Sequence, residues 1–162
     1  MPSSHNIDIK IEAGEWSEFL PNWQNVCKQA ANAVLDSQWK TNRPAEISIV
    51  LADDAFVRKL NKIYRGRDTS TNVLSFPSNE NYSEAITPRP IGDVVFAFET
   101  CCKELFNGDH LTEFADHICH LVVHGVLHLL GYKHEIKVEA EQMESLEIQI
   151  LANLGVKNPY GG

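Results

Sequence analysis

The sequence contains no long hydrophobic run and no N-terminal export signal. No stretch approaches the roughly 18 consecutive apolar residues that a membrane-spanning helix requires. The first residues, MPSSHNIDIK, lack the apolar segment that follows a basic start in a secretory signal peptide. Four cysteines are present, but none of them forms a CxxC pair. We therefore expect an unprocessed, reduced, cytoplasmic protein that does not act at a membrane.

Basic residues are also scarce. The chain has 14 Lys and Arg against 22 Asp and Glu, a formal charge of -8. This excludes nucleic-acid binding through the net charge of the protein, because phosphate binding depends on clustered positive charge. Both signs are clustered, however. The basic cluster is Arg58, Lys59, Lys62, Arg65 and Arg67, and the acidic one is Glu135, Glu139, Glu141, Glu144 and Glu147. These clusters predict either one basic surface on an otherwise acidic protein, or two solvent-exposed helix faces without a binding role.

Length and hydrophobic pattern indicate one small domain. A chain of 162 residues forms one hydrophobic core and is too short for two, so we expect residues 1–162 to be a single domain. Short apolar or alternating runs predict strands over 6–12, 46–52, 72–77 and 91–98, the first at a sheet edge. Helical periodicity predicts helices over about 21–35, 54–66, 99–106, 112–130 and 138–154. The expected fold class is α/β (α+β), with one mixed sheet of about four strands packed with about five helices.

The helix predicted over 54–66 is defined at both ends. Asp53 and Asp54 are the candidate capping residues at its start, and Gly66 ends it as a stop signal. Four apolar residues are expected to form its core-facing stripe: Phe56, Leu60, Ile63 and Tyr64. The polar, proline-rich stretch 78–90 predicts a surface loop.

Histidines are concentrated near the end of the fourth predicted helix. Four of them fall on one helical stripe, so that pairs four residues apart can chelate one ion: His117, His120, His124 and His128. Gly131 tolerates a positive φ and can end the helix, which returns His134 to the same ion. Three neutral imidazoles are a common set of protein ligands in a catalytic zinc site. The fourth position of such a site holds a water with a pKa of about 7. We therefore predict that His124, His128 and His134 bind one Zn²⁺ ion at the end of a central helix.

The remaining residues of this segment bear on which reaction the metal site could catalyse. His117 and His120 are expected to be hydrogen-bonded core residues or to support the ligands, because three ligands suffice. The spacing HxxxHxxGxxH also occurs in metzincin proteases, which place a Glu after the first histidine as general base. Gly125 holds that position here, and no Asp or Glu nearby in the sequence replaces it. A protease of that kind would therefore lack its proton acceptor.

Four segments carry a resemblance to a known family. They are YRGRDTSTNVLSFP (64–77), IGDVV (91–95), HGVLHLLGYKH (124–134) and EAEQMESLEIQILANLGVKNPY (139–160). With these segments, in this order, the chain resembles the YbeY family of bacterial endoribonucleases over most of its length. The resemblance implies a small α/β domain with a metal-bearing helix. It also implies single-strand-specific RNA cleavage in 3′-end maturation of small-subunit ribosomal RNA and in ribosome quality control.

The resemblance implies roles for individual residues. The zinc ligands of the family correspond to three residues here: His124, His128 and His134. Arg65 corresponds to the functional arginine of the family's cleft. Two positions depart from the family, because Lys133 stands where Asp is usual and Ser70 where Pro is usual. Lys133 removes a carboxylate and adds a positive charge close to the ion.

The expected function is therefore zinc-dependent cleavage of RNA phosphodiester bonds. Arg65 would clamp the developing negative charge in a bidentate way that Lys does not reproduce, and the other residues of the basic cluster would hold flanking phosphates. Asn72 and Ser75 either line the same cleft as hydrogen-bond donors or are ordinary polar residues of a strand. The expected partners are single-stranded regions of ribosomal RNA and the ribosome or its proteins.

Two alternatives remain open from the sequence. One is a ribosome-assembly factor that binds RNA or protein and uses zinc only to fix its C-terminal helices. A structural zinc has four protein ligands, and His120 is better placed to be the fourth than Cys119, which lies about 100° further round the helix. The other alternative is a metallohydrolase of peptides or small phosphoesters.

Overall fold

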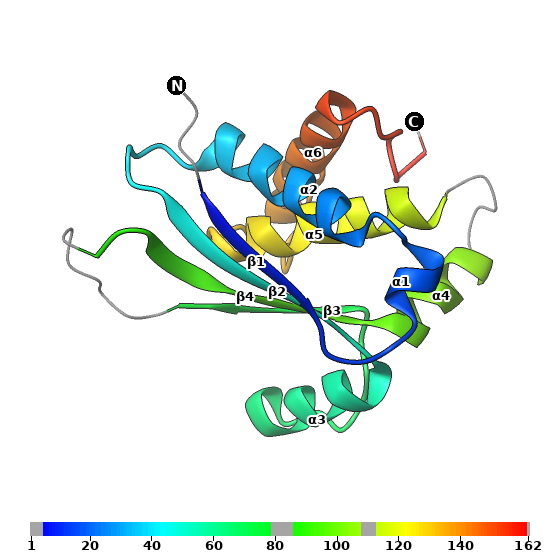
Figure 1. Cartoon of the computed structure of the whole chain (residues 1–162). Coiled ribbons are helices and arrows are strands. Elements are labelled where there is room, and N and C mark those ends of the chain that lie inside the picture. The colour runs from blue at the N-terminus through cyan, green and yellow to red at the C-terminus, as the bar shows by residue number, and fades with distance from the viewer. Residues whose placement is uncertain (1–4, 79–85, 108–112, 162) are drawn as a thin grey trace.

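The computed structural model describes residues 5–78, 86–107 and 113–161, which form one mixed sheet with helices on both faces (Figure 1). The strands in these residues are β1 (Asn6–Ile11), β2 (Ala45–Ala52), β3 (Val73–Pro77) and β4 (Arg89–Ala97). The helices are α1 (Trp16–Phe19), α2 (Trp23–Gln38), α3 (Asp54–Arg65), α4 (Phe98–Asn107), α5 (Phe114–Leu129) and α6 (Lys137–Asn153). The predicted fold class is confirmed, with the short α1 as an additional helix. Most of the loop predicted over 78–90, and the predicted helix start at 112, lie outside the described residues.

The four strands follow the order β1-β2-β4-β3. β1, β2 and β4 are parallel neighbours, and β3 pairs antiparallel with β4 along the other edge. β1 therefore lies at an edge, as its alternating pattern predicted. Because β3 is the opposite edge strand, Pro77 at its end is tolerated without the loss of a hydrogen bond inside the sheet.

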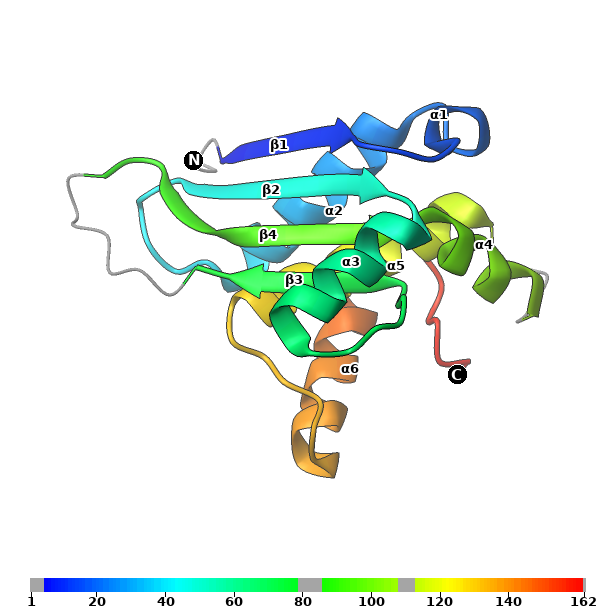
Figure 2. The same cartoon turned by 90° about the horizontal axis from the view of Figure 1, so that it is seen from below.

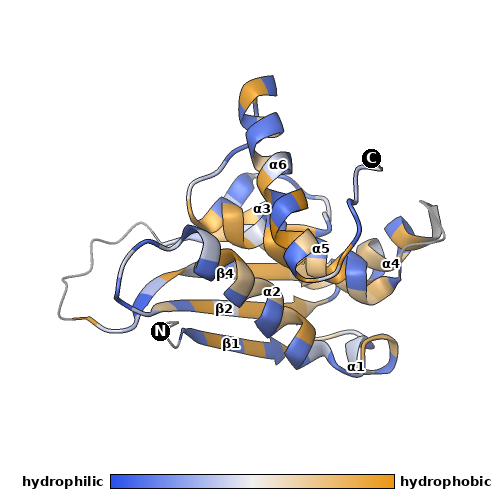
Figure 3. Ribbon diagram, turned by 90° about the horizontal axis from the view of Figure 1, so that it is seen from above, coloured by the Kyte–Doolittle hydropathy of each residue, from blue (hydrophilic) through white to orange (hydrophobic). Residues whose placement is uncertain are grey.

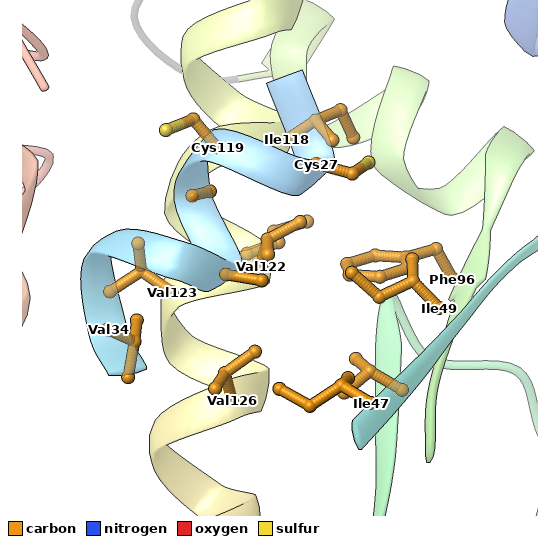
Figure 4. Close-up of a cluster of buried hydrophobic side chains, with 14 of the residues drawn as sticks. Cys27, Val34, Ile47, Ile49, Phe96, Ile118, Cys119, Val122, Val123 and Val126 are labelled. Carbon is orange, nitrogen blue, oxygen red and sulfur yellow. The ribbon is translucent and has the colours of Figure 1, made fainter. Parts of the chain in front are cut away.

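The main core lies between the sheet and the helix layer formed by α2 and α5 (Figures 1 and 3). Ile47 and Ile49 of β2 and Phe96 of β4 meet Val122 and Val126 of α5 in its centre (Figure 4). All five side chains are completely buried, and full burial of a side chain of this size contributes about 1.5–3 kcal/mol. This packing holds α5, which carries most of the histidines, against the sheet. None of the helices in the described residues is both long and apolar enough to cross a bilayer.

α3 lies on the opposite face of the sheet (Figure 2). The Asp53 side chain accepts a hydrogen bond from the Phe56 backbone N at 2.9 Å, and Gly66 follows the helix with φ +69°, so both predicted ends are confirmed. Phe56 and Leu60 pack against a small cluster of buried residues under the helix, as predicted. The prediction was wrong for Ile63 and Tyr64, which are 62% and 68% exposed. The last turn of α3 lies at the β3 edge of the sheet (Figure 2).

Gly125 marks the closest approach of α5 to the sheet. A Cβ atom at this position would lie 2.7 Å from Val94 Cγ1, a distance that real Cβ contacts do not reach. Ser75 Oγ donates a hydrogen bond of 2.9 Å to the Gly125 carbonyl oxygen, which ties β3 to the same point of the helix. These contacts fix the depth at which α5 crosses β3 and β4.

Candidate metal centre

Three histidines from two neighbouring segments come together at the C-terminal end of α5. His124 and His128 lie one turn apart on the helix, and His134 follows in the connection to α6. Their ring centroids are 4.6 Å (His124 to His128), 4.7 Å (His128 to His134) and 5.2 Å (His124 to His134) apart. Gly131, with φ +100°, lets the chain leave the helix and turn back. The three predicted ligands therefore form a group in which each offers a nitrogen within 4.8 Å of the others.

Hydrogen bonds fix the proton positions on two of these rings. His128 Nδ1 lies 2.8 Å from the Tyr132 carbonyl oxygen, and His124 Nδ1 lies 3.1 Å from Glu147 Oε2. A carbonyl and an ionised carboxylate only accept, so Nδ1 of each ring carries a proton, and in the neutral form of each ring Nε2 carries a lone pair. The two Nε2 atoms face each other at 3.1 Å. Two lone pairs at this distance repel unless a cation lies between them.

The observed geometry fits a metal ion bound between the two rings. Burial, and then the neighbouring His124, lower the pKa of His128 to about 4, so the ring is neutral at pH 7. Two imidazoles on a tetrahedral zinc, with bonds of about 2.0–2.1 Å, place their nitrogens about 3.3 Å apart, close to what is seen here. The donor set, three neutral imidazoles, is also one that zinc accepts.

A buried carboxylate that the sequence did not single out supports the histidines. Glu147 of α6 is 1% exposed, and its Oε2 accepts from His124 Nδ1 and from His120 Nε2 at 2.8 Å. Its Oε1 accepts from the Tyr160 hydroxyl at 2.7 Å. Burial by itself would raise the pKa of Glu147, but these three hydrogen bonds outweigh it and hold the pKa at about 2. Glu147 is therefore ionised at neutral pH and holds His124 by a charged hydrogen bond.

A signal for Glu147 was present in the sequence. It stood in the acidic cluster near the C-terminus, for which a solvated helix face was one of the two expectations. The buried residues of α6 are Met143, Glu147, Ile150 and Leu151, which recur at helical spacing. A glutamate on the apolar stripe of a helix, four residues from Met143 and Leu151, marks a buried carboxylate that needs partners.

The other two histidines of α5 have hydrogen-bond partners, in line with a supporting role. His120 contacts Glu147 and lies 3.3 Å from the Tyr160 hydroxyl. His117 Nε2 lies 3.0 Å from Glu104 Oε1. Both rings line a cavity of about 300 Å³ between α4, α5 and the C-terminal segment. Among the described residues, His120 belongs to a second group with His124 and Glu147 and does not join the three-histidine group.

Arg65 lies at the C-terminal end of α3 and contacts β3. Its Nη2 donates a hydrogen bond of 2.7 Å to the Ser75 carbonyl oxygen, and its guanidinium carbon lies 5.4 Å from the centroid of the Phe76 ring. Ser75 also donates its hydroxyl to Gly125, the neighbour of His124, so this one strand residue connects Arg65 to the histidine helix. A guanidinium has five N–H donors, so the bond to Ser75 orients the group without exhausting its donors.

Two further residues considered from the sequence are used within the fold. The Ser75 hydroxyl is bonded to Gly125, and the Asn72 amide donates to both carboxylate oxygens of Glu104 at 2.9 and 3.2 Å. Burial would raise the pKa of Glu104, but hydrogen bonds from His117 and Asn72 lower it below its ordinary value. Asn72 and Ser75 are therefore structural hydrogen-bond donors. In the basic cluster, Arg58 forms a two-point pair with Asp68 at 2.8 and 3.1 Å.

Comparison with known proteins gives a consistent match. The model of a protein family described as endoribonuclease YbeY matches residues 8–155. The chain is 45% identical to the endoribonuclease YbeY of Paramagnetospirillum magneticum, covering 96% of this chain and 95% of the relative. It is 46% identical to the protein of the same name from Azorhizobium caulinodans, covering 95% of each. The solution structure of TM1509 from Thermotoga maritima shares the fold, with a TM-score of 0.52 and 23% identity over 92% of this chain and 91% of that one.

Proposed function

Because the chain belongs to the YbeY family of endoribonucleases, we propose that it is a zinc-dependent endoribonuclease that cleaves phosphodiester bonds in single-stranded RNA. We place it in the cytoplasm, in 3′-end maturation of small-subunit ribosomal RNA and in ribosome quality control, with the ribosome or its proteins as partners. Residues 1–162 would act as one domain. The observation that carries the metal dependence is the pair of facing Nε2 atoms of His124 and His128, 3.1 Å apart.

We assign one Zn²⁺ ion to His124, His128 and His134. Three protein ligands leave one position of a tetrahedral site for water or substrate, which is the arrangement of catalytic zinc. When bound, the ion supplies Lewis-acid chemistry to a phosphoryl oxygen or to water. Glu147 and the Tyr132 carbonyl group hold two of the rings with Nε2 directed at the site.

Charge stabilisation is the part of the reaction assigned to Arg65. Cleavage of a phosphodiester increases the negative charge on the non-bridging oxygens, and a planar guanidinium can bind two of them at once. The hydrogen bond to Ser75 and the contact with Phe76 keep the Arg65 side chain at the β3 edge. Lys133 is exposed beside His134 and adds positive charge that attracts phosphate to this side of the molecule.

Two observations favour this function over the alternatives. A structural zinc would need a fourth protein ligand, but among the described residues neither His120 nor Cys119 belongs to the three-histidine group, and His120 is bonded to Glu147. A metzincin-type protease would need a Glu at position 125, where Gly125 stands and a Cβ atom would lie 2.7 Å from Val94 Cγ1. Both observations support a catalytic ion that serves a substrate other than a peptide.

The test is cleavage of an end-labelled RNA with a single-stranded 3′ tail. Four preparations are compared: wild type, metal-stripped protein, the same protein after zinc is restored, and His128→Ala purified identically. We expect cleavage by the wild-type and zinc-restored proteins alone. His117→Ala, a histidine substitution on the same helix outside the three-histidine group, is the matched control and should keep most of the activity. Equal cleavage in all preparations would indicate a contaminating nuclease and reject the proposal.

A further inference from the structure

Two apolar side chains are exposed on α3 at positions where helical spacing predicts core residues. Tyr64 is 68% exposed and Ile63 is 62% exposed, although residues earlier in the same helix are packed against the sheet. Burying these two side chains would be favourable, so their exposure calls for an explanation beyond folding. They directly precede Arg65 in the sequence, at the same end of α3.

The Tyr64 ring is held in place by its neighbours. It meets the Phe76 ring edge to face, with centroids 5.6 Å apart and an interplanar angle of 66°. Phe76 in turn lies under the guanidinium of Arg65, which is fixed by its hydrogen bond to Ser75. Contacts of both kinds are attractive, so the exposed aromatic ring is oriented before any ligand arrives. Preorganisation of this kind lowers the entropy cost of binding.

The same strand residue connects this ring to the histidines. Ser75 accepts from Arg65 with its carbonyl oxygen and donates to Gly125 with its hydroxyl. Gly125 directly follows His124 on α5. Tyr64, Phe76 and Arg65 therefore form a group at β3. Ser75 of this strand also contacts α5, the helix that carries His124 and His128.

The charge around Tyr64 identifies the chemistry of the ligand. The basic cluster lies on the same helix as Tyr64, where Lys59, Lys62 and Arg65 are exposed, although the whole chain has a charge of -8. A positively charged surface that also presents an aromatic face is the combination that binds single-stranded nucleic acid, with phosphates on the cations and bases on the ring.

We propose that Tyr64 is a stacking platform for an unpaired base of the RNA substrate, next to the phosphate bound by Arg65. The proposal rests on the endoribonuclease function and adds how the site selects its substrate. A base inside a duplex has both faces covered, so only an unpaired base can stack on the ring. Stacking accepts any base, so the platform selects single-stranded RNA with little sequence preference.

The first test compares steady-state kinetics of Tyr64→Phe, Tyr64→Leu and the wild type on one single-stranded RNA. Tyr64→Phe keeps the aromatic face and should keep KM within about twofold, whereas Tyr64→Leu keeps apolar bulk and should raise KM about tenfold or more, the size of one lost base–aromatic stack. Ile63→Ala is the matched control, because it removes an equally exposed apolar side chain beside Tyr64 without removing a ring. The KM of Ile63→Ala should stay at the wild-type value, and circular dichroism should give all variants the wild-type melting temperature.

A second test measures base stacking by fluorescence on binding and does not depend on RNA cleavage. A single-stranded oligonucleotide that carries 2-aminopurine should lose fluorescence on binding to wild type and Tyr64→Phe but not to Tyr64→Leu, and the duplex form should show no difference between variants. If wild type cleaves RNA and Tyr64→Leu matches it in KM and quenching, the platform is rejected and the function stands. If wild type quenches but does not cleave, the function fails and the platform stands. An equal increase in KM for Ile63→Ala and Tyr64→Leu would show that both side chains bind the substrate by apolar contact. This result would reject stacking on the Tyr64 ring.

Discussion

Glu147→Gln replaces a buried carboxylate with an amide of nearly the same shape. In the wild type, Glu147 Oε2 accepts from His124 Nδ1 at 3.1 Å and from His120 Nε2 at 2.8 Å. An amide oxygen at the place of Oε2 keeps both hydrogen bonds, but the acceptor is no longer charged. The amide nitrogen then takes the place of Oε1, where the Tyr160 hydroxyl has to accept instead of donate. The substitution therefore tests whether the charge on Glu147 makes His124 a better ligand, while the packing around it is preserved.

The size of the effect follows from the position of Glu147 one hydrogen bond behind a ligand. Replacing such a partner typically weakens metal affinity about 10- to 100-fold, which corresponds to about 1.4–2.7 kcal/mol. The assay is competition for zinc between the protein and a chromophoric chelator at pH 7. Glu141→Gln is the matched control, because Glu141 is an exposed glutamate on the same helix and should leave zinc affinity unchanged. Equal affinity in wild type and Glu147→Gln would refute the supporting role of Glu147.

The pKa of Glu147 adds an independent result for the metal-free protein. Its hydrogen bonds hold the pKa at about 2, below the ordinary value of 4.5, despite burial. A carboxyl group with a lower pKa in the folded state stabilises the protein above pH 4.5 and loses that contribution as the pH falls toward 2. In wild type, the free energy of unfolding should therefore decrease over this range. The decrease should be smaller in Glu147→Gln, which has no proton to bind at this position.

Two further predictions concern the packing of the core. Gly125→Ala should lower the free energy of unfolding in urea by about 1–3 kcal/mol despite the better helix propensity of Ala, because overpacking costs this much and the new Cβ would lie 2.7 Å from Val94 Cγ1. An unchanged urea midpoint would show that α5 does not approach the sheet so closely. Burial raises the pKa of Cys27 to about 12, so native protein treated with iodoacetamide at pH 8 should stay unlabelled at this position by mass spectrometry until it is unfolded. Labelling at Cys27 at the rate of an exposed thiol would contradict the packing of α2 on α5.

The features that the sequence predicted correctly are set by residues close together in the chain. The positions of the strands and helices follow from periodicity within each segment, and the caps of α3 follow from Asp53 and Gly66 alone. The grouping of His124, His128 and His134 is equally local, because it needs one helical turn and a glycine with positive φ. A contiguous stretch of eleven residues, HGVLHLLGYKH, contains all of this information.

The features that were missed depend on contacts between distant segments. The sequence does not determine that α6 packs beside α5, so the acidic pattern of α6 did not distinguish Glu147 from its exposed neighbours. The exposure of Ile63 and Tyr64 was missed for a related reason, because helical spacing predicts an apolar face but not where the sheet beneath it ends. The strand order β1-β2-β4-β3 likewise depends on pairings between strands far apart in the chain.

The carboxylate next to the histidines decides between two chemistries that share the HxxxHxxGxxH spacing. In the metzincin pattern, the carboxylate follows the first histidine and serves as general base. Here position 125 is a glycine packed against Val94, and the carboxylate comes from α6 instead. Glu147 contacts Nδ1 of His124, on the opposite side of the ring from the Nε2 atom that faces His128. From there it can orient the ring, but it cannot accept a proton from a nucleophile on the Nε2 side. The spacing of the histidines therefore predicts the ion, and the packing around them places the carboxylate at a different position from the general base that accompanies this spacing in proteases.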